Sequence, residues 1–341
     1  MDRPTVTHPL AGRAYLLSLL VGIAGALGVF ALTLTVLGRT GNLPPPAFSN
    51  SLCVDEKLKY LRDRGSADDP NLLVIGSSVA WRHVDTSRLR EELPGVQPLN
   101  GAFCGLSAHQ STYVADWLID REPSVRQVVM IVDPQDFAAC STKPVAVFDR
   151  KDADDYVYGG AAQWRYYLRY FEPRSLIRNA ISVKRQRTDG ADWDPLIFTR
   201  YGDGPLNPEG NRGLHYAAAS PLDERCFDAL EGFAQAQHHE GRSLLLVSTP
   251  LHPDWKRQYD PAGDLLRRFD SRLTAALRGT SARYWNADRV WTVPEDAFVD
   301  AIHMRWPAAQ QFSRALASNL DIVPPASPVV ERLVNVARVA P

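Results

Sequence analysis

The longest apolar stretch of the chain lies close to its N-terminus. Residues Ala14–Gly38 (AYLLSLLVGIAGALGVFALTLTVLG) contain no charged side chain. A helix rises about 1.5 Å per residue, so a helix of this length exceeds the roughly 30 Å hydrocarbon core of a bilayer. The pattern therefore predicts a single transmembrane helix over residues 14–38, with residues 1–13 in the cytoplasm.

A cleavable signal peptide is the alternative interpretation of this stretch. The apolar part of a signal peptide is usually about 7–15 residues long, and no Ala-x-Ala pattern follows Gly38. We therefore expect the helix to stay attached as an anchor. Arg3 and Arg13 precede it and Arg39 follows it, a weak bias that favours the short N-terminus inside. The expected location is the inner membrane, single-pass, with the body of the protein periplasmic or extracellular.

Five later stretches have the pattern of buried strands in a parallel sheet. They are Asn71–Ser77, Gln97–Asn100, Val125–Val132, Arg242–Ser248 and Ala282–Asn286, of which the second and the last are shorter and weaker. Helical patterns lie around them at Val54–Arg64, Ser107–Arg121, Pro221–Glu240, Pro261–Arg278 and Pro307–Leu320. Strands that alternate with helices predict an α/β fold with a doubly wound parallel sheet, whose sites lie at the carboxyl ends of the strands.

The remaining segments suggest the domain organisation. Residues 39–52 contain three consecutive prolines and predict a stiff linker that holds the body away from the membrane. The α/β domain would span residues 53–321, followed by a short tail over 322–341. The alternation stops at about 138–220, which predicts an inserted cap over the strand ends. Its one clear helical pattern, near Ala161–Tyr170, carries aromatic residues that either pack inward or form a sugar-stacking or partner-docking surface.

Charge and cysteine content narrow the functional classes. The 341 residues include 38 basic and 39 acidic ones, for a net charge of -1. Without a basic excess or a zinc-type Cys/His cluster, we expect no nucleic-acid partner and no metal. The four cysteines are an even number, which permits disulfides in an exported body. The alternative is that they are small buried apolar residues.

Two short motifs at opposite ends of the body contain candidate catalytic residues. The first predicted strand runs into a Gly-Ser-Ser motif that ends at Ser78, where a sharp turn and a helix start bring a hydroxyl and backbone N–H groups together. An Asp-x-x-His motif, Asp300 to His303, precedes the last helix. A serine nucleophile needs a base, and the base needs an orienting carboxylate. Each motif alone is common, and a helix-capping serine is the alternative for the first.

These motifs resemble the SGNH (GDSL-type) hydrolase superfamily, whose fold is a flavodoxin-like parallel sheet. Ser78 stands in the position of the family's nucleophile, with Ser77 where Asp is more usual. Asp300 and His303 match the last block of the family. The resemblance implies a catalytic triad of Ser78, His303 and Asp300.

The two middle blocks of that family concern the oxyanion hole. Asn100 and Gly105 have the spacing of the second block, which implies that the N–H groups of Gly105 and Ser78 hold the oxyanion. The third block usually carries Gly-x-Asn-Asp, whereas this chain has Asp-Pro-Gln-Asp from Asp133. The usual Asn is therefore missing, and Gln135 is its expected substitute.

The single anchor and a Pro-Gln-x-Phe segment after the third strand are similar to membrane-anchored alginate O-acetylation proteins and to the teichoic acid D-alanine transfer protein. The resemblance implies an extracytoplasmic serine acyl-transfer enzyme without a cofactor. It would be an O-acetyltransferase that acts on an exported polysaccharide or cell-envelope glycan beside a membrane-bound O-acyltransferase. Two alternatives stay open: an acetyl or carbohydrate esterase of the same type, and a non-catalytic scaffold that binds a glycan or the acyltransferase.

Three further predictions concern the surroundings of this site. His252 follows the fourth strand and His109 opens the helix after Gly105, so both are weaker candidates for substrate binding. A generic loop histidine is the alternative for each. Cys104 and Cys140 follow neighbouring strands, and a disulfide between them would brace the pocket.

Overall fold

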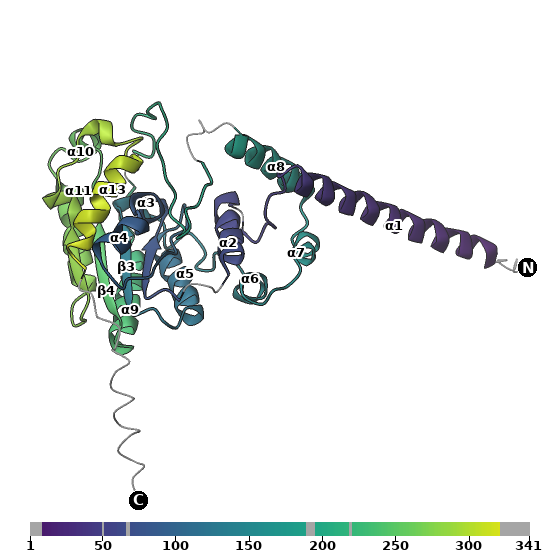
Figure 1. The fold of residues 1–341 in the computed structure, drawn as a ribbon, viewed down its shortest axis with the longest axis horizontal. Helices are drawn as coiled ribbons and strands as arrows, with labels where there is room; N and C mark the ends of the chain where they lie inside the picture. The colour runs from purple at the N-terminus through teal and green to yellow at the C-terminus, as the bar shows by residue number, and fades with distance from the viewer. Residues whose placement is uncertain (1–8, 50, 66–68, 189–194, 218–219, 321–341) are drawn as a thin grey trace, which may run out of the picture.

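The computed structural model describes residues 9–49, 51–65, 69–188, 195–217 and 220–320. Residues 1–8 of the predicted cytoplasmic N-terminus and the predicted tail at 322–341 lie outside the described residues. Within them, a long helix, α1 (Pro9–Arg39), projects from an α/β body (Figure 1). The body holds the candidate chemistry.

Five parallel strands form one sheet in the order β2-β1-β3-β4-β5. The strands are β1 (Leu72–Gly76), β2 (Pro98–Asn100), β3 (Gln127–Val132), β4 (Ser243–Ser248) and β5 (Arg283–Asn286). Each lies within a run that the sequence predicted. The order reverses at β1, as in flavodoxin-like sheets. The predicted α/β fold class with a parallel sheet is confirmed.

Alternate side chains of the strands enter two separate apolar layers. The register partners Val74, Val129 and Leu245 face one layer, and the residues that precede them face the other. Because both faces of the sheet are covered, its strands are apolar throughout rather than alternating with polar residues.

Helices cover both faces of the sheet. One layer contains α2 (Leu52–Arg64), α5 (Ala108–Arg121), α9 (Glu224–His239) and α11 (Asp264–Ala276). The other contains α3 (Ser78–His83), α4 (Thr86–Glu92), α10 (Pro253–Tyr259), α12 (Ala287–Val290) and α13 (Trp306–Ala317). There are also two short 3-10 helices among the described residues. The helix η1 (Pro134–Phe137) follows β3, and η2 (Glu295–Ala297) precedes the Asp-x-x-His motif.

The insertion contains more helix than the sequence predicted. Within its described residues lie α6 (Arg150–Val157), α7 (Trp164–Arg169) and α8 (Pro173–Thr188). Only α7 coincides with the predicted helical pattern. Charged and polar residues outnumber apolar ones in α6 and α8, so neither shows a clear apolar period. Figure 1 shows α6, α7 and α8 at the end of the body from which α1 projects.

The proline-rich segment after α1 is packed against the body. Its three consecutive prolines are buried, and Phe48 is only 6% exposed. The ring of Phe48 lies 4.7, 5.1 and 5.2 Å from the rings of Tyr156, Tyr166 and Tyr170. Residues 43–49 therefore do not form a free spacer that holds the body away from the membrane.

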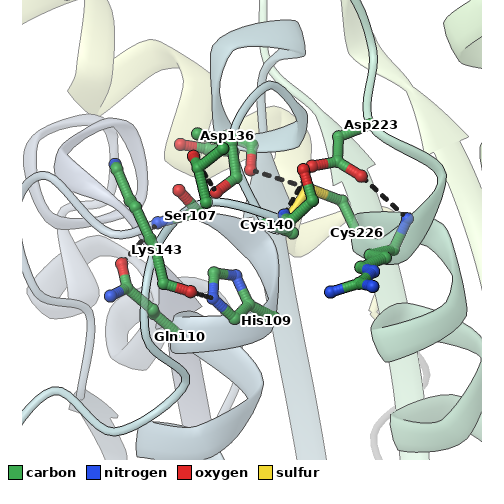
Figure 2. The surroundings of a disulfide bond; sticks show 12 residues. Ser107, His109, Gln110, Asp136, Cys140, Lys143, Asp223 and Cys226 are labelled. Carbon is green, nitrogen blue, oxygen red and sulfur yellow. Dashed lines mark hydrogen bonds between the residues drawn. A yellow bond between two sulfur atoms is a disulfide. The ribbon is translucent and has the colours of Figure 1, made fainter.

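The cysteines pair differently from the prediction. The disulfides are Cys53–Cys104 and Cys140–Cys226, with Cα–Cα distances of 6.2 and 5.3 Å. The predicted Cys104–Cys140 disulfide is wrong, because each loop cysteine instead meets a helix that covers the sheet. Cys53 belongs to α2 and Cys226 to α9. Figure 2 shows the second disulfide, which joins the segment after η1 to α9.

The helix α1 is long and apolar enough to cross a membrane. Its segment Gly12–Arg39 has a mean hydropathy of 2.3 in its most apolar window, and none of that window is buried in the protein. A signal sequence near the N-terminus passes the same test.

Candidate active site

Ser78 lies where β1 ends and α3 begins. Gly76, the last residue of β1, has a φ of +139°, and a Cβ on it would lie 2.3 Å from the backbone oxygen of Ile131. Only glycine fits this turn between two closely packed strands. As the first residue of α3, Ser78 places its N–H among the helix donors that have no intrahelical acceptor.

His303 lies within hydrogen-bond distance of Ser78. His303 Nε2 is 2.9 Å from Ser78 Oγ, and His303 Nδ1 is 3.0 and 3.1 Å from the two carboxylate oxygens of Asp300. Ser78 and His303 are 225 positions apart in the sequence. The sheet brings them together because the turn after β1 and the loop before α13 lie at its carboxyl edge.

Asp300 is held rigidly and is fully buried. One carboxylate oxygen accepts the backbone N–H groups of Ile302 and His303, at 3.0 and 2.9 Å, which fixes the Asp-x-x-His turn. Burial alone would raise the pKa of Asp300, but the hydrogen bonds and the charge of His303 outweigh it and leave the pKa below its ordinary value. The carboxylate is therefore ionised at neutral pH and orients Nδ1–H, so that Nε2 faces Ser78.

A second histidine, His83 of α3, supports the loop that carries His303. Its Nε2 accepts the backbone N–H of Met304 at 2.9 Å, and its Nδ1 lies 2.7 Å from Thr249 Oγ1. Because Nε2 is an acceptor, the ring proton lies on Nδ1 and is donated to Thr249. Burial, together with the nearby His303, lowers the pKa of His83 well below its ordinary value. His83 is therefore a neutral, buried support of the site.

We expect His83 to make the free energy of unfolding depend on pH. Its pKa is lower in the folded than in the unfolded protein, so its contribution is complete above about pH 6.5 and is lost as the pH falls, by at most about 1.4 kcal/mol per pH unit. The variant His83→Gln keeps an acceptor for Met304 N–H but does not titrate, and should lose this part of the slope. Denaturant unfolding between about pH 5 and pH 7 measures it. Equal slopes for both proteins would contradict the assignment.

A cavity of about 660 Å³ opens beside Ser78 and His303. Two of the predicted oxyanion residues, Gly105 and Gln135, line it from the loops after β2 and β3. The helix α8 forms a polar wall of the same cavity through Arg178, Asn179, Ser182 and Gln186. The cavity therefore has space for a substrate larger than a simple ester.

The predicted oxyanion donors Gly105 and Gln135 line the same cavity as Ser78. Gly105 has a φ of +70° and lies in the turn after β2. The side-chain amide of Gln135 donates a hydrogen bond to the backbone oxygen of Tyr216. An amide has two N–H groups, so one can still face the cavity. The oxyanion roles of Ser78, Gly105 and Gln135 stay predictions.

Two buried carboxylates, Asp133 and Asp136, also line the cavity. Asp133 caps η1 by accepting the N–H groups of Gln135 and Asp136 at 2.6 and 3.2 Å, and the side chain of Ser77 donates to Asp136. Burial raises the pKa of Asp133 to about 6 and that of Asp136 well above its ordinary value. The segment from Asp133 to Asp136 thus forms a rigid support beneath the site.

Tyr216, which sequence reasoning missed, covers one side of His303. It is the one non-glycine residue with positive φ, +66°, in the described ranges, an uncommon conformation for a bulky side chain. Its ring centroid lies 5.6 Å from that of His303, edge to face. The backbone oxygen of the preceding His215 accepts the backbone N–H of Ala301 at 3.2 Å, which ties this part of the insertion to the Asp-x-x-His turn. No motif marks this residue in the sequence.

The two weaker candidates do not reach the cavity. His252 caps α10 by accepting the backbone N–H of Asp254 at 3.1 Å. His109 of α5 lies with Nε2 3.2 Å from the backbone oxygen of Lys143, as Figure 2 shows. Neither residue is part of the cavity lining around Ser78. The structure gives both a local structural role and provides no support for substrate binding.

Comparison with known proteins gives a distant likeness. No family model and no curated protein matches the chain. A solved structure from Agrobacterium tumefaciens str. C58, named as that of a putative arylesterase, covers 73% of this chain and 97% of its own, with 15% identity and a TM-score of 0.34. A likeness at this level defines no family.

Proposed function

We propose that this chain is a membrane-anchored serine acyl-transfer enzyme whose body works outside the cytoplasm. The observation that carries the proposal is the continuous hydrogen-bond chain from Ser78 Oγ through His303 to Asp300, at 2.9 and 3.0 Å, beside a large cavity. Such a constellation transfers acyl groups through a covalent acyl-enzyme.

In the first half-reaction, Ser78 Oγ attacks the carbonyl carbon of an ester or thioester. His303 Nε2 takes the serine proton as the bond forms. The N–H groups of Ser78 and Gly105, with Gln135 as a third donor, would stabilise the oxyanion, and each well-placed donor lowers the barrier by about 3–4 kcal/mol. When the intermediate collapses, the leaving group departs with the proton from His303, and the acyl group stays on Ser78.

In the second half-reaction, an acceptor hydroxyl replaces the leaving group. His303 Nε2 removes the hydroxyl proton while the acceptor oxygen attacks the acyl carbon. The bond to Ser78 Oγ then breaks, and the serine recovers its proton from His303. Asp300 stays ionised and stabilises the imidazolium at both stages. A sugar hydroxyl as acceptor gives O-acylation, and water gives ester hydrolysis.

We propose an acetyl group as the acyl group and an exported polysaccharide or cell-envelope glycan as the acceptor, with a membrane-bound O-acyltransferase as the supplying partner. The polar wall that α8 adds to the cavity supports a polyhydroxylated acceptor. Gln186 Oε1 on this wall is buried without a hydrogen-bond partner among the described residues, which suits a sugar hydroxyl. The apolar helix α1 supports work at a membrane.

Ester hydrolysis is the second candidate. None of the three triad residues comes from the insertion, so the first half-reaction does not depend on the polar wall. Hydrolysis and transfer then differ only in the acceptor that reaches the acyl-enzyme.

A competition between water and an oligosaccharide separates the two candidates. We expect the purified full-length chain to move acetyl from a chromogenic ester to acetyl-free polysaccharide fragments, and Ser78→Ala to do neither reaction. Gln186→Ala should reduce transfer while hydrolysis of the small ester continues, because Gln186 lies on the acceptor wall.

The products decide the outcome, and mass spectrometry of the oligosaccharide measures them. Free acetate as the sole product with every acceptor tested would favour the esterase. A folded chain that turns over no acetyl ester would favour the non-catalytic scaffold.

A further inference from the structure

The insertion presents an apolar stripe on the outside of the body. Trp164 and Leu168 of α7 are 59% and 43% exposed, and Phe171, two residues after the helix ends, is 51% exposed. The spacing of four residues places Trp164 and Leu168 on one face of α7. Tyr166 and Tyr167, between Trp164 and Leu168 in the sequence, are buried. The aromatic run of the sequence is therefore divided between an inner and an outer side.

This stripe is continuous with the apolar helix α1. The rings of Phe171 and Phe30 are 5.1 Å apart, edge to face. Phe30, Leu34 and Leu37 lie on one face of α1 and are partly buried, whereas the other residues from 12 to 40 are exposed. In Figure 1, α7 lies at the end of the body from which α1 projects. A membrane that surrounds α1 would thus come close to α7.

The thickness of a bilayer sets the depth of this contact. Taking Ala14, directly after Arg13, as the inner edge, a helix crosses the roughly 30 Å hydrocarbon core in about 20 residues and reaches the outer edge near Thr33. Phe30 lies within one turn of that position. Phe171, which packs against Phe30, is therefore at the level where acyl chains meet headgroups.

We propose that Trp164, Leu168 and Phe171, the α7 stripe, sit in the outer boundary of the bilayer that α1 crosses. Tryptophan is enriched at this boundary, where its ring bridges apolar and polar surroundings. Arg165 is exposed beside the stripe, where its guanidinium suits lipid phosphates. This inference rests on α1 staying attached as the anchor, as in the proposed function.

Contact between the α7 stripe and the membrane would set the orientation of the active-site cavity relative to the membrane. The helix α8 follows α7 closely and forms the polar wall of the cavity. A second hollow of about 250 Å³ is lined by Phe171 and Ser175, and it shares Arg178 and Asn179 with that wall. An acyl donor held at the membrane surface would therefore lie next to the polar wall of the active-site cavity.

Depth-dependent fluorescence quenching tests the proposal on the full-length chain. All four cysteines lie in disulfides, so Leu168→Cys adds a unique thiol that takes an environment-sensitive fluorophore. The labelled protein is placed in nanodiscs of phosphatidylcholine and phosphatidylglycerol. These nanodiscs also contain lipids with a nitroxide near the headgroup, which quenches a nearby fluorophore. We expect a loss of about half the emission or more, because interfacial helices lie about 5–10 Å into this boundary.

Matched variants give the controls. A probe at Val290→Cys, 67% exposed on α12, should keep its emission, and a probe at Leu27→Cys in α1 should lose it. Adding Trp164→Glu to the Leu168→Cys protein should restore much of the lost emission. Hydrolysis of a soluble acetyl ester should be unchanged by Trp164→Glu, because Trp164 lies outside the cavity lining.

The outcomes separate this inference from the proposed function. A Leu168 probe that keeps its emission beside a quenched Leu27 probe overturns the inference and leaves acyl transfer untouched. An unquenched Leu27 probe removes the anchor on which both proposals depend. If the Leu168 probe reports an apolar environment only when two protein copies share a nanodisc, the stripe binds a second copy. This result also overturns the inference.

Discussion

Replacing Ser78 or His303 by alanine should abolish acyl transfer, and the double variant should be little worse than either single one. Ser78 Oγ forms the acyl bond and His303 Nε2 moves every proton, so each group is useless without the other. We expect a loss of about 10⁴-fold or more in kcat for each variant. Initial rates on a chromogenic acetyl ester measure the effect, and circular dichroism verifies the fold.

Asp300 and His252 provide graded and matched controls for this prediction. Asp300→Ala should cost less than the loss of either reacting group, because the carboxylate orients His303 rather than bonding to substrate. Asp300 also accepts two backbone N–H groups, so the variant can lose stability as well as activity. Thermal unfolding of Asp300→Ala measures that loss separately. His252→Ala removes a histidine outside the cavity and should leave the rate unchanged. Losses that add up in the double variant would show that Ser78 and His303 do not act as a unit.

Removing the Cys140–Cys226 disulfide should lower the free energy of unfolding by about 4–5 kcal/mol. The disulfide joins residues separated by 86 positions, and its loss frees the unfolded chain from a long closed loop. The double variant Cys140→Ser/Cys226→Ser tests this by denaturant unfolding without reductant. Thiol counting on denatured, unreduced wild type exported from the cytoplasm should find no free thiol among the four cysteines.

The other disulfide is the matched control for this effect. Cys53–Cys104 joins residues separated by 51 positions and lines the cavity, so its removal should change the KM for a large acceptor as well as stability. Reductant should destabilise the wild type more than either double variant. A Cys140→Ser/Cys226→Ser protein as stable as the wild type would contradict the stabilising role of this bond.

The sequence predicts a strand well where burial of the strand requires a run of apolar residues. The central strands β1, β3 and β4 are buried on both faces, and this produces continuous apolar runs. The edge strand β5 is only partly buried, so its pattern is weak. The helices α3 and α4 span fewer than three turns each and show no helical period that a sequence pattern can reveal.

The candidate site was predictable only where a local motif carries it. Ser78 lies in a Gly-Ser-Ser motif at a sharp turn between a strand and a helix. Asp300 and His303 are three residues apart, a spacing that one turn of the backbone brings together. The contacts of Tyr216 and His83 depend on the path of the insertion and on burial, and neither has a sequence signal. The disulfide partners were wrong for the same reason, because they depend on where α2 and α9 pack against the sheet.

Detection of an acetyl group bonded to Ser78 Oγ is the most direct test of the proposed acyl-enzyme. The protein would be mixed with a chromogenic acetyl ester, quenched with acid within the first turnovers, digested and analysed by mass spectrometry. We predict one acetyl group on the Ser78 Oγ of the wild type and none on any residue of Ser78→Ala. Steady ester turnover with no acetyl on Ser78, or with the acetyl group on another residue, would rule out Ser78 as the nucleophile.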